Sequence, residues 1–546
     1  MPRGRDDERA RGSTGALATI FGVALVMSLG ACATRPLGKL SEPAFDMPAR
    51  FDIQGAAPLS DRWWQAFDDP ALNGLINQAL SNNFTLASAY ARVQQAEATV
   101  ASQRSGLFPT LTGRASESVT HREQGGNSGG GLNLGDLLGS GAAGGGAGND
   151  SALRNLTLGS SDNSDWTTSR RLGLSASYEI DLFGRIRNGL EAAKLSRQSL
   201  QSALQSAAVT LAGNIASQWY SYQELDARVA LLKSQIDTNQ NVLDLTTFSF
   251  NNGQAAAADV LRQRQTVEAS QAQLAQARAQ AAVARHALAV LVGVSSSTFD
   301  PPAGKLVALP PLPATGVPST LLMRRPDVRQ QYYTLASDNR QVAVALANRY
   351  PQLSLSADYS GVAHPSAMFA DWILQLGAQI TQPIFDGGER RAAIRQAQAV
   401  VDEDVADYQQ TLLEALQEVD DALVNERQQT RYLQRLNKQL DISKDVVANL
   451  RLRYLRGATS YLDVLDALLN RQQLQVDQLT GKRQLLDYRI NLYRALAGSI
   501  DDPTIGIRQP LAGRSSDGPP STNASPSAPP PKSDPAAARS STQARS

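Results

Sequence analysis

The feature that most constrains the fold is a short pattern that occurs twice, about two hundred residues apart. It reads Phe250-Asn-Asn-Gly253 followed by Asp259-Val-Leu, and again Tyr454-Leu-Arg-Gly457 followed by Asp463-Val-Leu. Each copy separates two long segments with helical patterning, so each predicts a tight turn between antiparallel helices. A chain with two such helical hairpins is expected to form an extended tube or scaffold rather than a compact catalytic core.

The residues of these turns have structural interpretations that need no further function. Gly253 and Gly457 fit the left-handed conformation that ends a helix. Asp259 and Asp463 precede Val-Leu, as helix N-caps would. The same residues are also candidates for contacts at the end of the hairpins, and the sequence pattern leaves both interpretations open.

Each half of the chain predicts the same order: helix, strand, strand, long helix, turn, helix. The long helices cover about sixty residues, which corresponds to about 90 Å. The predicted regions are a signal peptide (1–31), an N-terminal linker (32–60), a first repeat (61–300), a second repeat (301–500) and a disordered tail (501–546). Strands are expected at about 111–119 and 169–183, separated by a Gly-rich insertion (121–168), and at about 353–361 and 371–383.

The predicted strands alternate apolar and polar residues. Leu172, Leu174, Ala176 and Tyr178 fall on one face, and the intervening Gly and Ser residues fall on the other. This pattern fits either a transmembrane barrel or a soluble sheet with one face on a core. Four strands cannot close a barrel in lipid, so other copies would have to complete it. Two copies would give eight strands and three would give twelve, and the small polar residues of the inner face favour the larger barrel.

The second long helix carries a coiled-coil pattern. Leu412, Val419, Leu433 and Leu440 are separated by multiples of seven residues, and Glu426 interrupts the series. A seven-residue period predicts left-handed supercoiling against neighbouring helices. An isolated helical bundle would show the same period, but it does not explain why strands interrupt the helices.

The N-terminus predicts export and lipidation. Arginines are concentrated in residues 3–11, an uncharged apolar run fills residues 16–29, and Leu29-Gly30-Ala31-Cys32 follows. This segment predicts a secretory signal that is too short to span a membrane. Its end resembles a bacterial lipobox, which implies that Cys32 becomes the lipidated N-terminus. An ordinary signal peptide with an incidental cysteine is the alternative, and Ala33 favours the outer membrane by the same resemblance.

Composition argues against two function classes. The 52 basic and 51 acidic residues nearly balance, which gives no case for a nucleic-acid partner. The three histidines, His121, His286 and His364, lack ligand-like spacing, and no nucleophile elbow or phosphate loop is present. We therefore expect no enzyme activity, no metal, and no cofactor other than covalent lipid on Cys32.

Together these motifs resemble the TolC-like outer membrane factor family, in its lipidated NodT-like branch, over about residues 55–500. The resemblance is carried by Trp63-Trp64-Gln-Ala-Phe67, Arg324-Arg325-Pro326-Asp327-Val328, Phe385-Asp-Gly-Gly388, the paired Phe108-Pro109 and Tyr350-Pro351, and the two turns. It implies a mostly α-helical chain with a membrane β-barrel, assembled as a homotrimer. The trimer would form a twelve-stranded barrel in the outer membrane and a twelve-helix barrel across the periplasm.

The resemblance also implies the orientation and the partners. The insertion 121–168 would be an extracellular loop, and the helical turns would form the periplasmic tip. There the tip would contact a periplasmic adaptor and, through it, an inner-membrane pump. The implied function is the passive exit duct of a tripartite efflux system for drugs or other small molecules.

The family closes this tip with polar contacts between hairpins. The matching positions are Asp259 and Tyr454, and Phe250, Gly253 and Gly457 complete the turns. Where the best-known gate has an arginine, this chain has Thr459, and Arg456 is a candidate substitute. Asp463 and Asp466 lie three residues apart and share a helix face. Repeated by three-fold symmetry, an inward Asp would form a carboxylate ring that favours cations.

Two alternatives share many of these features. A type I secretion duct would use the same channel, and the sequence does not separate it from an efflux duct. A lipid-anchored periplasmic helical scaffold or adaptor would explain the hairpins, but it would be expected to have one hairpin flanked by compact β-domains.

Overall fold

The structure is a computed structural model that describes residues 45–121, 166–318, 324–364, 367–500 and 505. The predicted signal peptide with Cys32, most of the Gly-rich insertion and nearly all of the C-terminal tail lie outside these residues. The described residues belong to one compact unit that ends at Ile507.

The described helices repeat the same lengths in the two halves. The helices α4 (Phe84–Ser105) and α8 (Pro326–Ala347) each have 22 residues. The long helices α5 (Arg185–Asn251) and α9 (Glu389–Leu455) each have 67, and α6 (Ala257–Val292) and α10 (Tyr461–Leu496) each have 36. The first half adds a 3-10 helix, η1 (Trp63–Phe67), and α3 (Pro70–Asn82).

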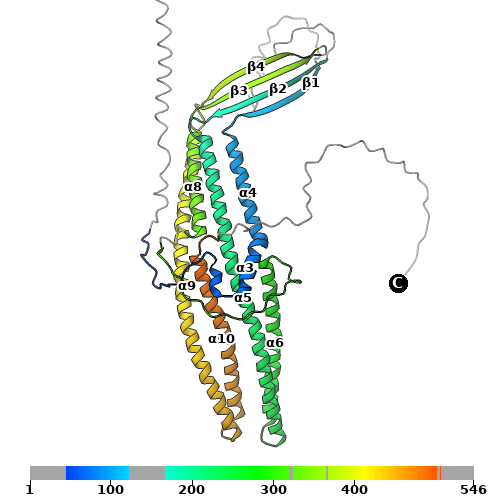
Figure 1. Cartoon of the computed structure of the whole chain (residues 1–546), viewed down its shortest axis with the longest axis vertical. Coiled ribbons are helices and arrows are strands. Elements are labelled where there is room, and N and C mark those ends of the chain that lie inside the picture. Colours follow the sequence, from blue (N-terminus) through cyan, green and yellow to red (C-terminus); the bar gives the residue numbers. More distant parts are fainter. Residues whose placement is uncertain (1–44, 122–165, 319–323, 365–366, 501–504, 506–546) are drawn as a thin grey trace, which may run out of the picture. The chain divides into compact units, whose positions relative to one another are not determined.

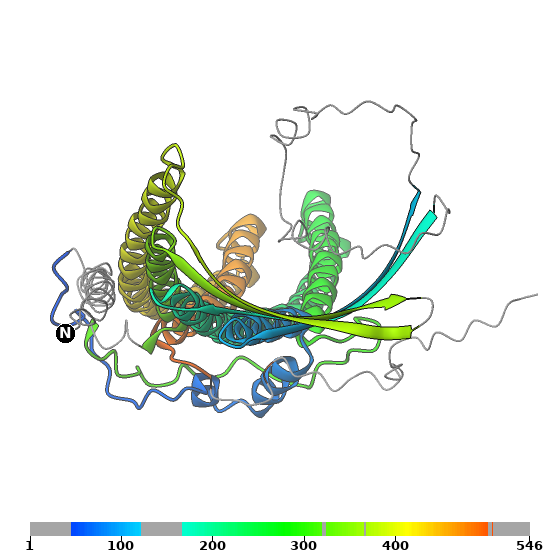
Figure 2. The same ribbon diagram turned by 90° about the horizontal axis from the view of Figure 1, so that it is seen from above.

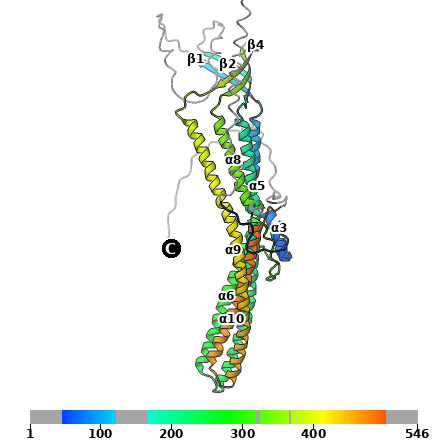
Figure 3. The ribbon, with the colours of Figure 1, turned by 90° about the vertical axis from the view of Figure 1, so that its left-hand side faces the viewer.

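The helices pack side by side along their length. The long helix α5 packs against α4, α6, α8 and α10, and α9 packs against α8 and α10. Figures 1 and 3 show the strands at one end of these helices and the α5–α6 and α9–α10 turns at the other end. Among the described residues, no helix combines the length and apolar character that a membrane crossing requires.

The strands form one antiparallel sheet in the order β1-β2-β3-β4. Its members are β1 (Thr110–His121), β2 (Trp166–Ile180), β3 (Gln352–His364) and β4 (Ala367–Thr381). Seen from above, the sheet is curved (Figure 2). The register places Leu174 opposite Tyr359, and Tyr359 opposite Leu374, so directly paired residues share one face. The outer edges of β1 and β4 have no partner strand within the described part of the chain.

The two faces of the sheet differ in polarity. One face carries exposed apolar side chains, among them Leu111 (73% exposed), Leu376 (75%) and Ile380 (70%). On the other face Ser175 lies opposite Asp358, and Ser177 opposite Ser356. The described part of the chain therefore leaves the apolar face uncovered, unlike a soluble sheet whose apolar face packs on a core of the same chain.

Both strands of the first hairpin extend further than predicted. Pairing continues to His121 opposite Trp166, so the ends of the predicted insertion 121–168 are strand. At its other end β2 stops at Ile180, and the predicted extension to residue 183 is a turn that leads to Gly184, the N-cap of α5. The glycine adopts φ 75°, a conformation that ends the strand and starts the helix.

The N-terminal aromatic motif builds the largest core cluster. Trp63 and Trp64 are fully buried, and Trp63 stacks on Tyr493 of α10 with ring centroids 5.6 Å apart. Asp69 caps α3 by accepting backbone hydrogen bonds, and it also accepts one from the Trp219 indole at 2.8 Å. The motif thus joins the N-terminal segment to α5 and α10.

Glu426 interrupts the heptad of α9 because it has a buried partner. Its carboxylate accepts two hydrogen bonds from Arg489 of α10, at 2.7 and 2.6 Å. Arg489 also donates to the carbonyls of Pro310 and Pro311 in the connection between the halves.

One residue of the predicted disordered tail, Ile505, is instead buried in the same core cluster as Ile500.

Candidate functional site at the helix turns

The two turns have the same backbone conformation and the same backbone hydrogen bonds. Gly253 and Gly457 follow α5 and α9 with φ of 72° and 70°. The amide of Gly253 donates to the carbonyl of Phe250 and the amide of Gln254 to that of Ser249, at 2.9 and 2.8 Å. The second turn repeats both bonds, and this pair of bonds is the Schellman motif. The predicted role of the two glycines as turn residues is therefore correct.

The prediction that Asp259 and Asp463 are N-caps is wrong. The N-cap residues are Ala256 and Ser460, and both aspartates lie three positions further, in the first helical turn. Asp463 closes a capping box, in which its carboxylate accepts from the backbone N–H of Ser460 at 3.1 Å. Asp259 has no such role, because Ala256 has no side chain able to cap, and its carboxylate lies 3.9 Å from Arg262.

Thr459, which the resemblance places where the best-known gate has an arginine, makes its contact within its own hairpin. Its hydroxyl donates to the carboxylate of Asp463 at 2.6 Å. This bond, followed by those from Ser460, lowers the pKa of the exposed Asp463 carboxyl. Thr459 therefore stabilises the start of α10 rather than a contact with the other hairpin.

Asp259 of α6 and Tyr454 of α9, the positions that the resemblance assigns to the gate, lie near enough for the carboxylate to influence the phenol. Burial first, and the Asp259 carboxylate second, raise the pKa of Tyr454. No hydrogen bond joins the two side chains in the part of the chain that the structure describes. Tyr454 instead meets the ring of Tyr461 edge-on, with centroids 5.9 Å apart.

Tyr461 makes a direct hydrogen bond between the hairpins near the turns, and sequence reasoning missed it. Its hydroxyl, on α10, donates to the Oε1 of Gln263 on α6. Both residues are buried, at 4% and 0% exposed. Burial raises the pKa of Tyr461 to about 12, with Asp259 and Tyr454 adding to the shift against the lowering effect of Thr246. Nothing in the sequence links two residues 198 positions apart.

A buried polar seam continues from Tyr461 along the hairpins. Gln263 donates to the carbonyl of Asn239 on α5 at 2.6 Å. Asn239 donates to Ser270 of α6 at 2.9 Å and accepts from Gln472 of α10 at 2.9 Å. These side chains are neutral, so they join α5, α6 and α10 by hydrogen bonds alone, and losing one partner would leave a buried polar group unsatisfied.

The remaining tip candidates point to solvent. Phe250 is 43% exposed, and Arg456 and Asp466 are exposed as well. Arg456 is the C-cap residue of α9. Exposed side chains at the far end of the helices are available for contact with another protein, but the structure assigns them no partner.

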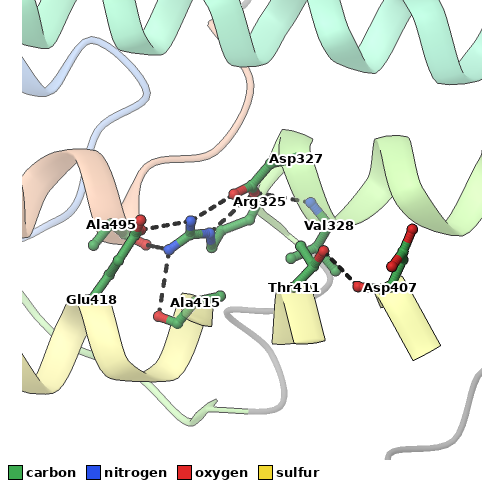
Figure 4. A network of polar contacts seen from close by, with 8 residues as sticks. All are labelled: Arg325, Asp327, Val328, Asp407, Thr411, Ala415, Glu418 and Ala495. Carbon is green, nitrogen blue, oxygen red and sulfur yellow. Dashed lines mark hydrogen bonds and ion pairs between the residues drawn. The ribbon is translucent and has the colours of Figure 1, made fainter. Parts of the chain in front are cut away.

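A second polar site centres on the Arg325 of the Arg-Arg-Pro-Asp motif (Figure 4). Arg325 donates to both carboxylate oxygens of Asp327, at 3.1 and 2.6 Å, and to Glu418 of α9 at 2.8 Å. It also reaches the carbonyls of Ala415 and Ala495. Burial alone would raise the pKa of Asp327, but the hydrogen bond and charge of the Arg325 guanidinium outweigh it. The pKa of Asp327 is therefore lowered. The motif therefore joins the start of α8 to α9 and to the end of α10.

The described residues contain no cluster of His, Cys, Asp and Glu arranged to hold a metal ion. Neither the tip nor the Arg325 site pairs a nucleophile with a general base. The polar contacts of both sites instead join long helices to one another, and the apolar face of the sheet stays uncovered in the described residues.

A sheet with an uncovered apolar face, joined to two long helical hairpins, defines a channel of the TolC-like class. The chain belongs to the outer membrane efflux protein family, whose model matches residues 75–294 and 317–498. Members of this family are channels of the outer membrane and are not enzymes.

Individual relatives agree with this family. The toluene efflux pump outer membrane protein TtgC of Pseudomonas putida is 28% identical over 476 residues, 85% of this chain and 89% of that protein. Nodulation protein T of Rhizobium leguminosarum bv. trifolii is 24% identical over 481 residues, 86% and 94%. The outer-membrane channel OprN is 28% identical, with a TM-score of 0.69 over 84% of this chain and 99% of that structure.

Proposed function

We propose that three copies of this chain form the exit duct of a tripartite efflux system. The duct conducts small molecules passively from an inner-membrane pump, through a periplasmic adaptor, to the outside of the cell. Three four-stranded sheets form a twelve-stranded barrel in the outer membrane, and the helices continue it as a twelve-helix tube through the periplasm.

The observation that carries this proposal is the sheet with two unpaired edges and an uncovered apolar face. Water disfavours such a face, and lipid disfavours open edges, because unpaired backbone groups cost several kcal/mol there. Closure with further copies satisfies both demands at once. The polar face, with Ser175, Ser177 and Asp358, then lines the lumen.

The helix turns are the natural place for gating and adaptor contact. They lie at the opposite end of the helices from the sheet (Figures 1 and 3). Tyr461, Gln263 and the seam hold the two hairpins of one copy together, while Phe250, Arg456 and Asp466 are exposed for a protein partner. Lipid on Cys32 supplies a second membrane attachment, and multiple acyl chains bind at about 0.8 kcal/mol per buried CH₂.

Conductance of the purified protein in a planar lipid bilayer tests the proposal. We expect discrete, long-lived and small current steps, as from a pore with a narrow tip. A bilayer that stays silent although insertion into lipid is confirmed, and although the tip is loosened by Tyr461→Phe, would contradict the channel function.

The lipid anchor needs its own experiment. Cys32→Ser should abolish incorporation of labelled palmitate and leave trimers in the outer membrane, because the apolar face of the sheet holds the barrel in lipid. Palmitate incorporation that survives this change would refute the modification site. Loss of trimers in the variant would show that the anchor is required for assembly.

A further inference from the structure

Two strongly exposed apolar residues stand at the corner where β4 leads into α9. Ile384 is 99% exposed and Phe385 is 91% exposed, the two highest values among the large apolar residues that the structure describes. They follow the end of β4 at Thr381 and precede Gly388, the N-cap of α9. Side chains of this size are rarely left uncovered in a folded protein without a partner.

The corresponding corner inside the chain is covered. Phe183 follows β2 and directly precedes Gly184, the N-cap of α5. Its ring stacks on Tyr350 at the start of the neighbouring strand β3, with centroids 4.6 Å apart and planes 16° apart. At this internal junction, the aromatic residue that follows one strand packs on the aromatic residue that precedes the next.

The free edge of β1 offers the matching half of such a contact. Phe108 is the third residue after α4 and Tyr350 the third after α8, and each is followed by proline and a strand. Phe108 is 58% exposed, whereas Tyr350 is covered by Phe183. The two outer edges of the sheet therefore each carry an uncovered aromatic residue, Phe385 beside β4 and Phe108 beside β1.

We propose that Phe385 of one copy packs on Phe108 of the next copy and so closes each junction between protomers, as Phe183 and Tyr350 close the junction within the chain. The proposal rests on the assembly of copies proposed above, and it names the residues that complete that assembly. Ile384 extends the same contact toward the exposed Leu111 of β1.

A second copy is favoured over lipid as the occupant of this corner. Edge pairing brings the end of β4 beside the start of the next β1, because antiparallel neighbours in this sheet place strand ends and strand starts together. The internal corner shows that an aromatic residue at this point turns toward the neighbouring strand. Aromatic pairs of this kind favour offset or edge contacts that stabilise an interface beyond the area that they bury.

Cysteine cross-linking tests the contact directly. Phe385→Cys combined with Phe108→Cys, treated in outer-membrane fractions with a short bifunctional maleimide, should give covalent dimers and trimers on a denaturing gel. Phe385→Cys combined with Leu182→Cys is the matched control, because Leu182 is 46% exposed but lies beside β2 rather than at the free edge. The control should give no covalent oligomers.

The outcomes separate this inference from the proposed function. Native trimers without cross-links between Phe385→Cys and Phe108→Cys would overturn the contact and leave the channel intact. Monomers in the wild-type protein would overturn the assembly itself. Modification of Phe385→Cys by a lipid-soluble maleimide, without cross-links, would identify lipid as the occupant and overturn the contact as well.

A second measurement keeps the test independent of cysteine chemistry. Phe385→Ala and Phe108→Ala should each lower the temperature at which trimers dissociate, and the double variant should lose little more than either single variant, because both remove one contact. Leu182→Ala should leave this temperature nearly unchanged. Additive losses from the two phenylalanine variants would contradict a direct contact.

Discussion

The two helical hairpins have equal helix lengths and equal turns, but different side chains stabilise them. Counted from the first residue of each helix, Asp463 corresponds to Asp259 and Ser460 to Ala256. Both turns end in a positive-φ glycine, yet only the second has a capping box. The same backbone turn therefore forms in both hairpins although the polar contacts beside it differ.

The difference continues into the packed region. By the same count, Glu426 corresponds to Tyr222 and Arg489 to Arg285. In the second hairpin these positions form a buried ion pair, whereas Arg285 only approaches the carbonyl of Phe299, at 3.5 Å. The second hairpin thus has a buried ion pair where the first has Tyr222 in place of the carboxylate. The stability of the second hairpin should therefore fall more when one partner is removed.

The largest expected effect comes from breaking this ion pair. Glu426→Ala leaves Arg489 buried without its carboxylate, which should cost about 3–5 kcal/mol of unfolding free energy. The measurement is guanidinium denaturation of the detergent-solubilised protein, followed by circular dichroism. As a control, Glu426→Ala combined with Arg489→Met should recover much of the loss, because neither charge is then left alone. A double variant as unstable as the single one would mean that Arg489 acts mainly through Pro310 and Pro311.

The next largest effect should come from Tyr461→Phe. The change removes the donor to Gln263 and leaves a buried amide oxygen unsatisfied, at a cost of about 1–3 kcal/mol. Because this bond joins the two hairpins, single-channel conductance should rise as well. Tyr454→Phe is the matched control, since its ring contact with Tyr461 survives. A larger conductance change in the Tyr454 variant would show that the gate contact is made by Tyr454, as the family resemblance implies, and not by Tyr461.

A smaller effect separates the two aspartates. Asp463→Ala removes the reciprocal half of a capping box and should lower amide protection in the first turn of α10 by about five-fold. Asp259→Ala removes no cap and should change the protection of the first turn of α6 by about two-fold or less. Hydrogen exchange measures both. Equal losses of protection in the two variants would show that the capping box contributes little.

The smallest expected effect is a pH dependence confined to the second half. Burial first, and the neighbouring carboxyl of Asp338 second, raise the pKa of Asp404 to about 7, and Asp407 and Glu403 contribute to this increase. Asp404 corresponds by count to Leu200 in α5, so the first half lacks this group.

The sign follows from the raised pKa. The folded state keeps the proton of Asp404 after the unfolded chain has lost it, so stability should fall as pH rises from about 4 to about 7. With solvent screening the change should stay below about 1 kcal/mol. Asp404→Asn should flatten this part of the thermal-midpoint profile, and a profile as steep as that of the wild type would contradict the assignment.

Local pattern was enough to predict much of the fold. Alternation identified the strands, and the repeated glycine identified both turns, because each depends on residues close in sequence. The spacing of Ser460 and Asp463 fits a capping box, but the sequence analysis interpreted Asp463 itself as the N-cap, which was wrong. The sequence showed that Glu426 interrupts an apolar seam, but it did not show that Arg489 is its partner.

Contacts between distant segments could not be predicted in this way. Tyr461 meets Gln263 only because the fold brings the start of α10 to α6 near the turns. Periodicity in the sequence does not specify which helices become neighbours. The family pattern directed attention to Asp259 and Tyr454, which do lie close to the contact. In this chain, however, the hydrogen bond that joins the hairpins beside these positions comes from Tyr461, seven residues after Tyr454.

The matched helix lengths place the two turns at the same distance from the sheet. Each long helix of 67 residues measures about 100 Å between the sheet and its turn, and each return helix has the same 36-residue count in both halves. A deletion in one long helix alone would set its turn back from the other and pull Tyr461 out of reach of Gln263. Relatives adapted to a wider or narrower periplasm should therefore change length in both halves together, in steps of about seven residues that keep the same faces in contact.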